Sequence, residues 1–128
     1  MRDCCSPGVG VRSFLSVFPQ LAFVLVAELR ASGRADLARE LEASDVTDVV
    51  FDSEANTGLV ALKPPRELNS VERNVIGQKL GQVIPFSRPN YAALQLDNFG
   101  RLVAVELLAP PLALGSALLV MSRNWKSV

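Results

Sequence analysis

Apolar and polar residues alternate between Tyr91 and Leu108, and this pattern predicts a β-hairpin. The two apolar runs are separated only by residues 97–101, where Asp97 opens the turn and Gly100 closes it. An aspartate in this place can accept hydrogen bonds from nearby backbone N–H groups, and a glycine adopts a positive φ without a Cβ clash. We expect Glu106 to face away from the core. The residues expected to face it are Leu94, Leu96, Val103, Val105 and Leu107.

A second, less tightly turned hairpin is predicted between Val46 and Leu62. Its first run, residues 46–51, is rich in β-branched and aromatic residues, and its second run, 59–62, stops before two prolines. The turn-forming sequence SEANTG lies between the two runs. Residues 83–86 are typical of one further short strand, and residues 87–90 of a loop.

Helical spacing of apolar residues predicts a pair of helices before the hairpin at 46–62 and one helix after the hairpin at 91–108. The first helix has Pro19 in its first turn, where a missing N–H costs nothing, and it ends at Gly33. The next covers about 34–43. The last begins near Leu112, and with about ten apolar positions it is shorter than the roughly 20 that a bilayer requires.

Residues 66–90 carry mixed signals, which favour a short helix over a strand. Asn69 and Glu72 have the spacing of a capping box. Gly81 would end this helix, although Val75 could equally begin a strand. The apolar residues expected on one face of the helix are Val71, Val75 and Leu80.

The apolar segment 14–27 allows two interpretations. Arg2 and Arg12 precede it, and a positive flank before a short apolar run is the outline of a secretory signal or a membrane anchor. The run is shorter than a spanning helix, contains Pro19, and continues into a charged helical sequence without a small-residue cleavage site. We expect a buried helix, with a signal or membrane anchor as the alternative.

These elements predict an α+β fold, with an N-terminal helical pair packed on a small, mainly antiparallel sheet of two β-hairpins and a C-terminal helix. Residues 1–12 are polar and small and are expected to form a disordered tail. Residues 13–128 then form a single α+β domain, an ordinary length for one hydrophobic core.

The charges restrict the possible partners. The 13 basic and 13 acidic residues cancel, so no overall field favours nucleic acid or an anionic membrane. Residues 28–54 nevertheless hold eight acids against three bases, and residues 63–101 hold six bases against three acids. This asymmetry is typical of solvated surface charge, and it also fits two faces of a self-associating molecule.

The chain has no histidine, and its two cysteines, Cys4 and Cys5, are adjacent. Neighbouring cysteines rarely bridge each other, so no disulfide framework is predicted and a reduced, cytoplasmic protein is expected. The absence of histidine removes the commonest general base and the commonest zinc ligand. The sequence predicts no metal site and no cofactor.

The two hairpins resemble those of a bacterial family of small proteins called domain of unknown function 2283. The resemblance covers about 49–109, with Phe51 where the family has tyrosine and Asn56 where it has aspartate. It implies a helix-plus-sheet fold and brings no activity. The matching residues are Phe51, Asp52, Ala55 and Asn56, and then Asp97, Gly100, Arg101, Leu102, Val103, Val105 and Glu106.

Two arrangements of carboxylates are candidates for catalytic or metal-binding chemistry. Oxygen ligands alternate from Asp52 to Gly58 as in a calcium loop, but Thr57 and Lys63 occupy the places of the required glycine and glutamate. Asp52 and Asp97 each open a turn and could converge if the hairpins lay side by side, raising one pKa. Turn capping is the simpler role, so no catalytic residue is predicted. A hydrolase-type enzyme using these two aspartates is the alternative.

Aromatic residues are the candidate interface: Phe99 at a turn tip, with Tyr91 and Phe86. Basic residues lie among them in sequence, a composition also found in nucleic-acid patches, but the zero net charge argues against nucleic acid. These bases are Arg66, Arg73, Lys79, Arg88 and Arg101. We therefore expect a small non-catalytic protein-interaction module that forms a homodimer or binds another protein.

Overall fold

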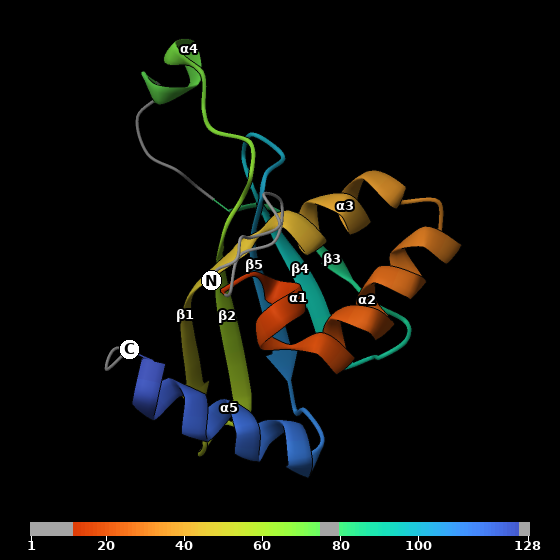
Figure 1. Ribbon diagram of the computed structural model, residues 1–128, viewed down its shortest axis with the longest axis vertical. Coiled ribbons are helices and arrows are strands. Elements are labelled where there is room, and N and C mark those ends of the chain that lie inside the picture. Colours follow the sequence, from red (N-terminus) through yellow and green to blue (C-terminus); the bar gives the residue numbers. More distant parts are fainter. Residues whose placement is uncertain (1–11, 75–79, 126–128) are drawn as a thin grey trace, which may run out of the picture.

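The computed structural model describes residues 12–74 and 80–125 (Figure 1). Of the predicted tail, only Arg12 lies within these ranges. The elements follow in the order α1 (Phe14–Val17), α2 (Pro19–Ala31), α3 (Ala35–Ala43), β1 (Asp45–Asp52), β2 (Thr57–Lys63), α4 (Ser70–Arg73), β3 (Leu80–Pro85), β4 (Ala92–Asp97), β5 (Leu102–Leu108) and α5 (Leu112–Asn124).

The strands form one antiparallel sheet in the order β1-β2-β5-β4-β3. β1 with β2 and β4 with β5 are the two predicted hairpins, and the pairing of β2 with β5 joins them. The predicted short strand at 83–86 begins earlier, at Leu80, and adds to the free edge of β4. With helices before and after the hairpins, the predicted α+β fold is confirmed.

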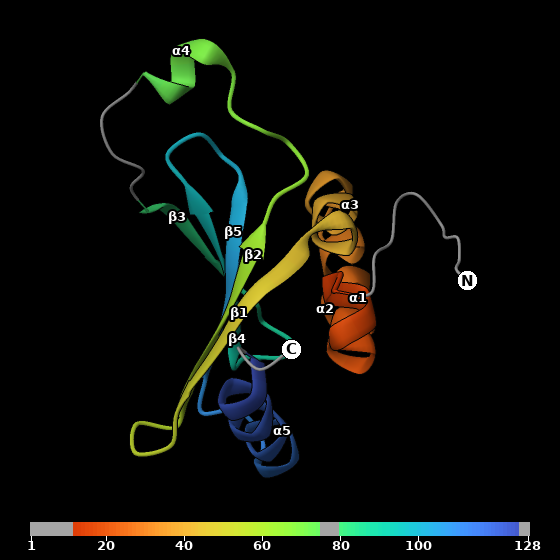
Figure 2. The same ribbon diagram turned by 60° about the vertical axis from the view of Figure 1, so that its left-hand side comes forward.

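The helices that pack on the sheet all lie against the same face of it (Figure 2). α1, α2 and α3 cover one part of this face, and α5 lies near the end that carries the β1–β2 turn. The hydrophobic core fills the space between helices and sheet. Its fully buried side chains include Phe14, Leu25, Leu41, Val60, Leu94 and Leu118.

The apolar segment 14–27 forms α1 and most of α2, and the two helices separate at Phe18 because Pro19 starts α2. This is the buried-helix arrangement. Within residues 12–74 and 80–125, no helix combines the length and the apolar character needed to cross a membrane. The residues that the segment buries are Phe14, Phe18, Leu21, Ala22, Leu25 and Val26.

The β4–β5 hairpin forms as predicted, with one correction to its inward-facing residues. Gln95 pairs with Ala104 but Leu96 pairs with Leu102, so a β-bulge leaves Val103 without a partner of its own. Leu102 is fully buried and takes the core position predicted for Val103, which is half-buried. Alternation alone misplaces this side chain because a bulge shifts the inward-facing register by one residue.

Glu40 connects α3 to this bulge. Its Oε2 accepts a hydrogen bond from the backbone N–H of Leu102 at 2.5 Å. Glu40 is therefore half-buried and bound to the sheet, while Ala38 and Leu41 are buried on the inner face of α3. A long side chain at the edge of a helix can reach a backbone group that periodicity does not reveal.

The predicted helix within 66–90 is also corrected. Asn69 and Glu72 do form the capping box, but α4 ends at Arg73 and Val71 is 75% exposed. Leu80 and Gly81 belong to β3, because Leu80 pairs with Asp97 and the following residues pair with β4. Gly81 lies so close to the backbone carbonyl of Asp97 that a Cβ would overlap it. Val75 lies outside the described residues.

α5 packs on the sheet at two close contacts. A Cβ built on Gly115 would lie 3.5 Å from the Phe51 ring, and Leu118 is fully buried beside Gly58. Just after the helix, Trp125 Nε1 donates a hydrogen bond to the Thr47 carbonyl at 3.0 Å. These contacts attach both the middle and the end of α5 to the β1–β2 hairpin.

Candidate functional site

Asp52 and Asp97 lie at opposite ends of the sheet. Asp52 ends β1 in line with Thr57 and Leu108, at the end of β5. Asp97 ends β4, beside the pairing of Leu96 with the first residue of β5. The full length of β5 separates the two carboxylates, so the structure does not bring them together. The arrangement that a carboxylate enzyme would need is not formed by this pair.

Asp52 instead closes its own turn. Its Oδ1 accepts hydrogen bonds from the backbone N–H groups of Glu54 at 3.0 Å and Ala55 at 3.2 Å. Its side chain therefore acts on local backbone groups, as turn capping requires. Among the described residues, no group of three or more cysteine, histidine, aspartate or glutamate side chains could hold a metal ion.

Asp97 caps the other turn from a buried position. Its carboxylate accepts hydrogen bonds, each 2.9 Å long, from the N–H groups of Phe99 and Arg101 and from Arg101 Nε. Burial by itself raises the pKa of this carboxyl, but the hydrogen bonds from Arg101 and Phe99 and the charge of Arg101 outweigh it. The net pKa of Asp97 lies below its usual value, and the carboxylate stays ionised.

Arg66 joins this turn to α4. Its guanidinium donates to Glu72 Oε1 at 3.0 Å and to the Phe99 carbonyl at 2.9 Å, while Arg101 Nη1 donates to the Arg66 carbonyl at 3.2 Å. The hydrogen bond to Glu72 raises the pKa of Arg66 and lowers that of Glu72. Asp97, Arg101, Arg66 and Glu72 thus form a polar cluster, here called the turn cluster.

The turn cluster removes two guanidinium groups from the predicted basic patch. Arg66 and Arg101 bind acceptors within the chain, and Arg73 Nε donates to the Leu68 carbonyl at 3.0 Å. Arg88 lies in the loop between β3 and β4, at the far end of β4 from the turn cluster. Lys79 lies outside the described residues. The described bases do not form one continuous surface.

The three predicted interface aromatics do not share a surface either. Phe86 is 7% exposed and belongs to the core, so it is not available to a partner. Tyr91 precedes β4 and Phe99 follows it, which places the two half-buried rings at opposite ends of that strand. The residues are close in the sequence, which suggested a patch. In the structure a strand runs between Tyr91 and Phe99 and separates them by its full length.

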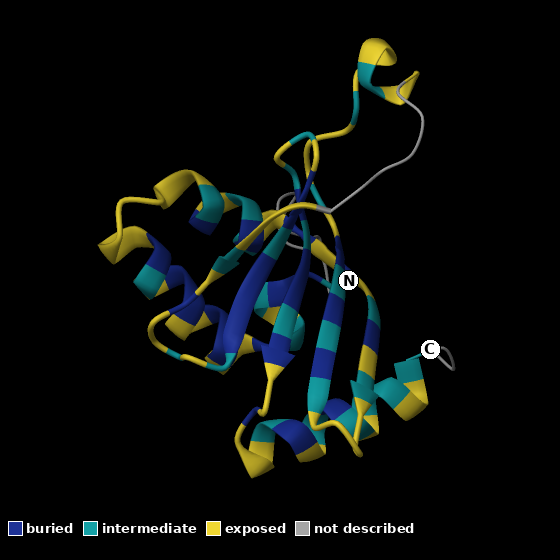
Figure 3. Ribbon diagram, turned by 180° about the vertical axis from the view of Figure 1, so that it is seen from behind, coloured by how far each residue is buried: buried dark blue, intermediate teal, exposed yellow. Residues whose placement is uncertain are grey.

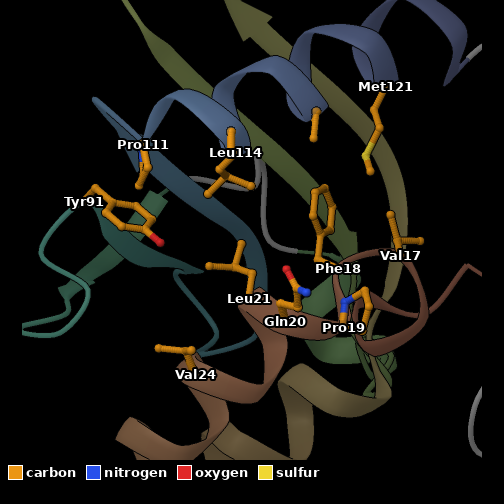
Figure 4. A pocket seen from close by; sticks show the side chains of 12 residues that line it. Val17, Phe18, Pro19, Gln20, Leu21, Val24, Tyr91, Pro111, Leu114 and Met121 are labelled. Atoms are coloured by element: carbon orange, nitrogen blue, oxygen red, sulfur yellow. The ribbon is translucent and has the colours of Figure 1, made fainter.

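An apolar groove of about 400 Å³ separates the start of α2 from α5 (Figure 4). One wall comes from residues between Val17 and Val24 and the other from residues between Pro111 and Met121, with Tyr91 at its side. Gln20 and Tyr91 are the polar residues among the described residues that line it, and none of these is charged. The groove lacks the paired titratable groups that acid–base chemistry requires.

The second face of the sheet carries no helix in the described part of the chain, and Figure 3 looks onto it. We call it the uncovered face. Valine and leucine side chains stand out from it, with Val50 52%, Leu108 50% and Val83 43% exposed. By strand alternation its residues are Asp48, Val50, Asp52, Thr57, Leu59, Ala61, Lys63, Val83, Pro85, Ala93, Gln95, Ala104, Glu106 and Leu108.

The centre of the uncovered face is flat. One row of paired residues crosses all five strands: Asp48, Ala61, Ala104, Gln95 and Val83. Its central member is Ala104 on β5, and Ala61 beside it on β2 is equally short, while Gln95 borders Ala104 on β4. A flat apolar centre with polar residues around it is typical of a protein-binding surface.

Sequence reasoning missed this surface because it judged each strand by its inward-facing residues. The signal was present in the outward positions of β2 and β5, where Leu59, Ala61 and Ala104 are apolar although a solvated face usually carries polar residues. Glu106 faces away from the core as predicted, since Val105 and Leu107 on either side of it are fully buried.

Comparison with protein-family models, with curated proteins and with solved structures found no match to this chain. The resemblance of the two hairpins to domain of unknown function 2283 stays a prediction.

Proposed function

We propose that this protein is a small non-catalytic protein-interaction module that self-associates through the uncovered face. The observation that carries the proposal is a five-stranded sheet with its packed helices on one side and an apolar, flat second side. An antiparallel sheet can leave one face in water, but that face then alternates to polar residues. Here Val50, Val83 and Leu108 stay exposed instead.

The size of the uncovered face fits a moderate-affinity dimer. Five strands about 4.8 Å apart and about six residues long give a footprint of roughly 20 Å by 20 Å. Side-chain relief raises the accessible area to roughly 600 Å² per partner, and two such areas reach the lower end, about 1,200 Å², of specific interfaces. The face is therefore large enough for a specific dimer, although its area alone does not set the affinity.

A second copy of the chain fits this face best. Two sheets pack face to face about 10 Å apart when neither presents long side chains at the centre, and Ala61 and Ala104 meet that condition. A second copy supplies a face of the same size and flatness, and a two-fold interface is the commonest symmetric solution. The surface also carries a cation, Lys63, and the anions Glu106 and Asp48, so opposite charges of two copies can meet across it.

The proposal includes a cytoplasmic location, because the adjacent pair Cys4 and Cys5 offers no disulfide framework. It also includes membership of the bacterial family that the hairpins resemble, which would make the self-association a property to look for in other small proteins with these hairpins.

The test is the molar mass in solution by sedimentation equilibrium at tens of micromolar chain. Wild type is expected at twice the chain mass of 13.8 kDa. Val50→Lys places a charge on the uncovered face and is expected to shift the protein toward monomer. Val120→Lys is the matched control, because Val120 is 57% exposed on α5, away from that face.

A monomeric wild type would refute the proposal outright. A dimer that Val120→Lys disrupts and Val50→Lys does not would place the interface on α5 and would also contradict it.

A further inference from the structure

We propose that two copies pair about a two-fold axis that runs across the strands over the row of Ala61 and Ala104, so that Lys63 of each copy meets Glu106 of the other. This inference rests on the proposed function, since it specifies the geometry of that same dimer. It follows from the strand register, the flat centre and the positions of Lys63 and Glu106 on the uncovered face.

The register places Lys63 and Glu106 on opposite sides of the alanine row. Ala61 pairs with Ala104, and Leu59 pairs with Glu106. Because β2 and β5 are antiparallel, Lys63 lies two residues from Ala61 in the direction away from Leu59. Each charged residue is therefore about 7 Å from the row, one on each side of it, on strands about 4.8 Å apart.

A two-fold rotation about the row exchanges its two sides. Glu106 of one copy then lies on the same side of the axis as the partner's Lys63. The two residues are offset across the strands by one strand spacing, because Glu106 is on β5 and Lys63 on the neighbouring β2. Face-packed sheets lie about 10 Å apart, and both side chains are long enough to bridge part of that gap. By symmetry the pair forms twice, while Ala61 and Ala104 face their own copies at the axis, where the sheets approach most closely.

The other two-fold arrangement puts the axis parallel to the strands. β5 is the central strand of the sheet, so this rotation sets Glu106 opposite the partner's Glu106. Two carboxylates facing each other inside an apolar interface repel. The axis that crosses the strands also sets a carboxylate, Asp48, opposite its own copy, but Asp48 lies on the edge strand β1, at the rim of the interface. This axis places the central Glu106 near a cation instead of another carboxylate, and that difference favours it.

The monomer leaves both charges available for this pairing. Lys63 is exposed and Glu106 is half-buried. The ion pairs formed among the described residues, such as Arg30 with Glu42 and Asp97 with Arg101, involve neither of them.

A charge swap tests the pairing. Lys63→Glu and Glu106→Lys each replace two attractive contacts with two repulsive ones, and each is expected to raise the dimer dissociation constant about tenfold or more. The double variant Lys63→Glu/Glu106→Lys restores opposite charges and is expected to return within about threefold of wild type. Glu67→Lys changes an exposed residue that lies outside the uncovered face, and it is expected to leave the constant unchanged.

The dissociation constants come from sedimentation equilibrium, and a thermal melt of each variant by circular dichroism shows that it is folded. A monomeric wild type refutes the proposed function itself. If wild type is dimeric but neither single variant weakens the dimer, or the double variant does not recover, the two-fold geometry is wrong while self-association stands.

A crosslink gives a second, independent readout. In a background of Cys4→Ser and Cys5→Ser, Ala61→Cys puts one thiol beside the axis in each copy. A short bismaleimide, which reacts with two thiols and spans the gap of about 10 Å between face-packed sheets, is expected to link two chains covalently. Val71→Cys on the exposed helix α4 is the control and is expected to stay unlinked at the same concentration. Equal linkage of the two variants, or linkage of the control alone, would overturn the geometry.

Discussion

Replacing Asp97 with alanine tests how much the turn cluster contributes to stability. Asp97 is 4% exposed, and its pairing with Arg101 is nearly buried, unlike the other ion pairs among the described residues. The variant removes the acceptor of two backbone N–H groups and of one guanidinium. It also leaves the charge of Arg101 with the Arg66 carbonyl as a remaining partner.

The expected loss follows from these contacts. A hydrogen bond to a charged group contributes about 1.5–3 kcal/mol, and three such bonds from Phe99 and Arg101 end on the Asp97 carboxylate. They share one side chain, and water can reach the turn once that side chain is shortened, so the three values do not add. We expect Asp97→Ala to lower the free energy of unfolding by about 2–4 kcal/mol.

Asp52→Ala is the matched control. Asp52 occupies the corresponding place in the other hairpin and also accepts two backbone N–H groups, but it is exposed. Water can replace those bonds, so the loss is expected to be much smaller. Urea unfolding followed by circular dichroism gives both free energies on the same scale.

The pH dependence has a definite sign. The folded-state pKa of Asp97 is lowered, so its contribution is fully present above the unfolded value of about 3.9 and is lost as the pH falls through the lower folded value. The difference between wild type and Asp97→Ala should therefore be constant near neutral pH and should shrink below about pH 4. Equal losses for the two aspartates, or a difference that does not shrink in acid, would refute this account of the turn cluster.

The remaining predictions concern two glycines and the contact at the end of α5. Gly100→Ala is expected to cost about 1–2 kcal/mol from its φ of +78° alone, since a Cβ there meets nothing within 4 Å. Gly81→Ala should cost more because its Cβ overlaps the Asp97 carbonyl, and urea unfolding that gives equal losses would contradict this. Trp125→Phe removes the hydrogen bond to Thr47 and is expected to cost about 1 kcal/mol, seen as a lower melting temperature; an unchanged value would count against that contact.

Local sequence determined those features whose physical cause lies within a few residues. Asp97 and Gly100 specify the turn because one accepts backbone hydrogen bonds and the other permits a positive φ. Pro19 sets the start of α2, and Asn69 with Glu72 forms the capping box. Alternation predicted which residues of β4 point into the core, because a strand reverses its side chains at every residue.

Only the tertiary structure decided how these pieces combine. The bulge that puts Leu102 instead of Val103 into the core depends on how β4 and β5 pair. The separation of Asp52 from Asp97 depends on the pairing of β2 with β5, where Thr57 lies beside Leu108. The uncovered face arises because the packed helices all settle on one side of the sheet. Contacts between segments this far apart in the chain leave no local pattern. The alternation within one strand does not show which strand it pairs with or which face of the sheet the helices cover.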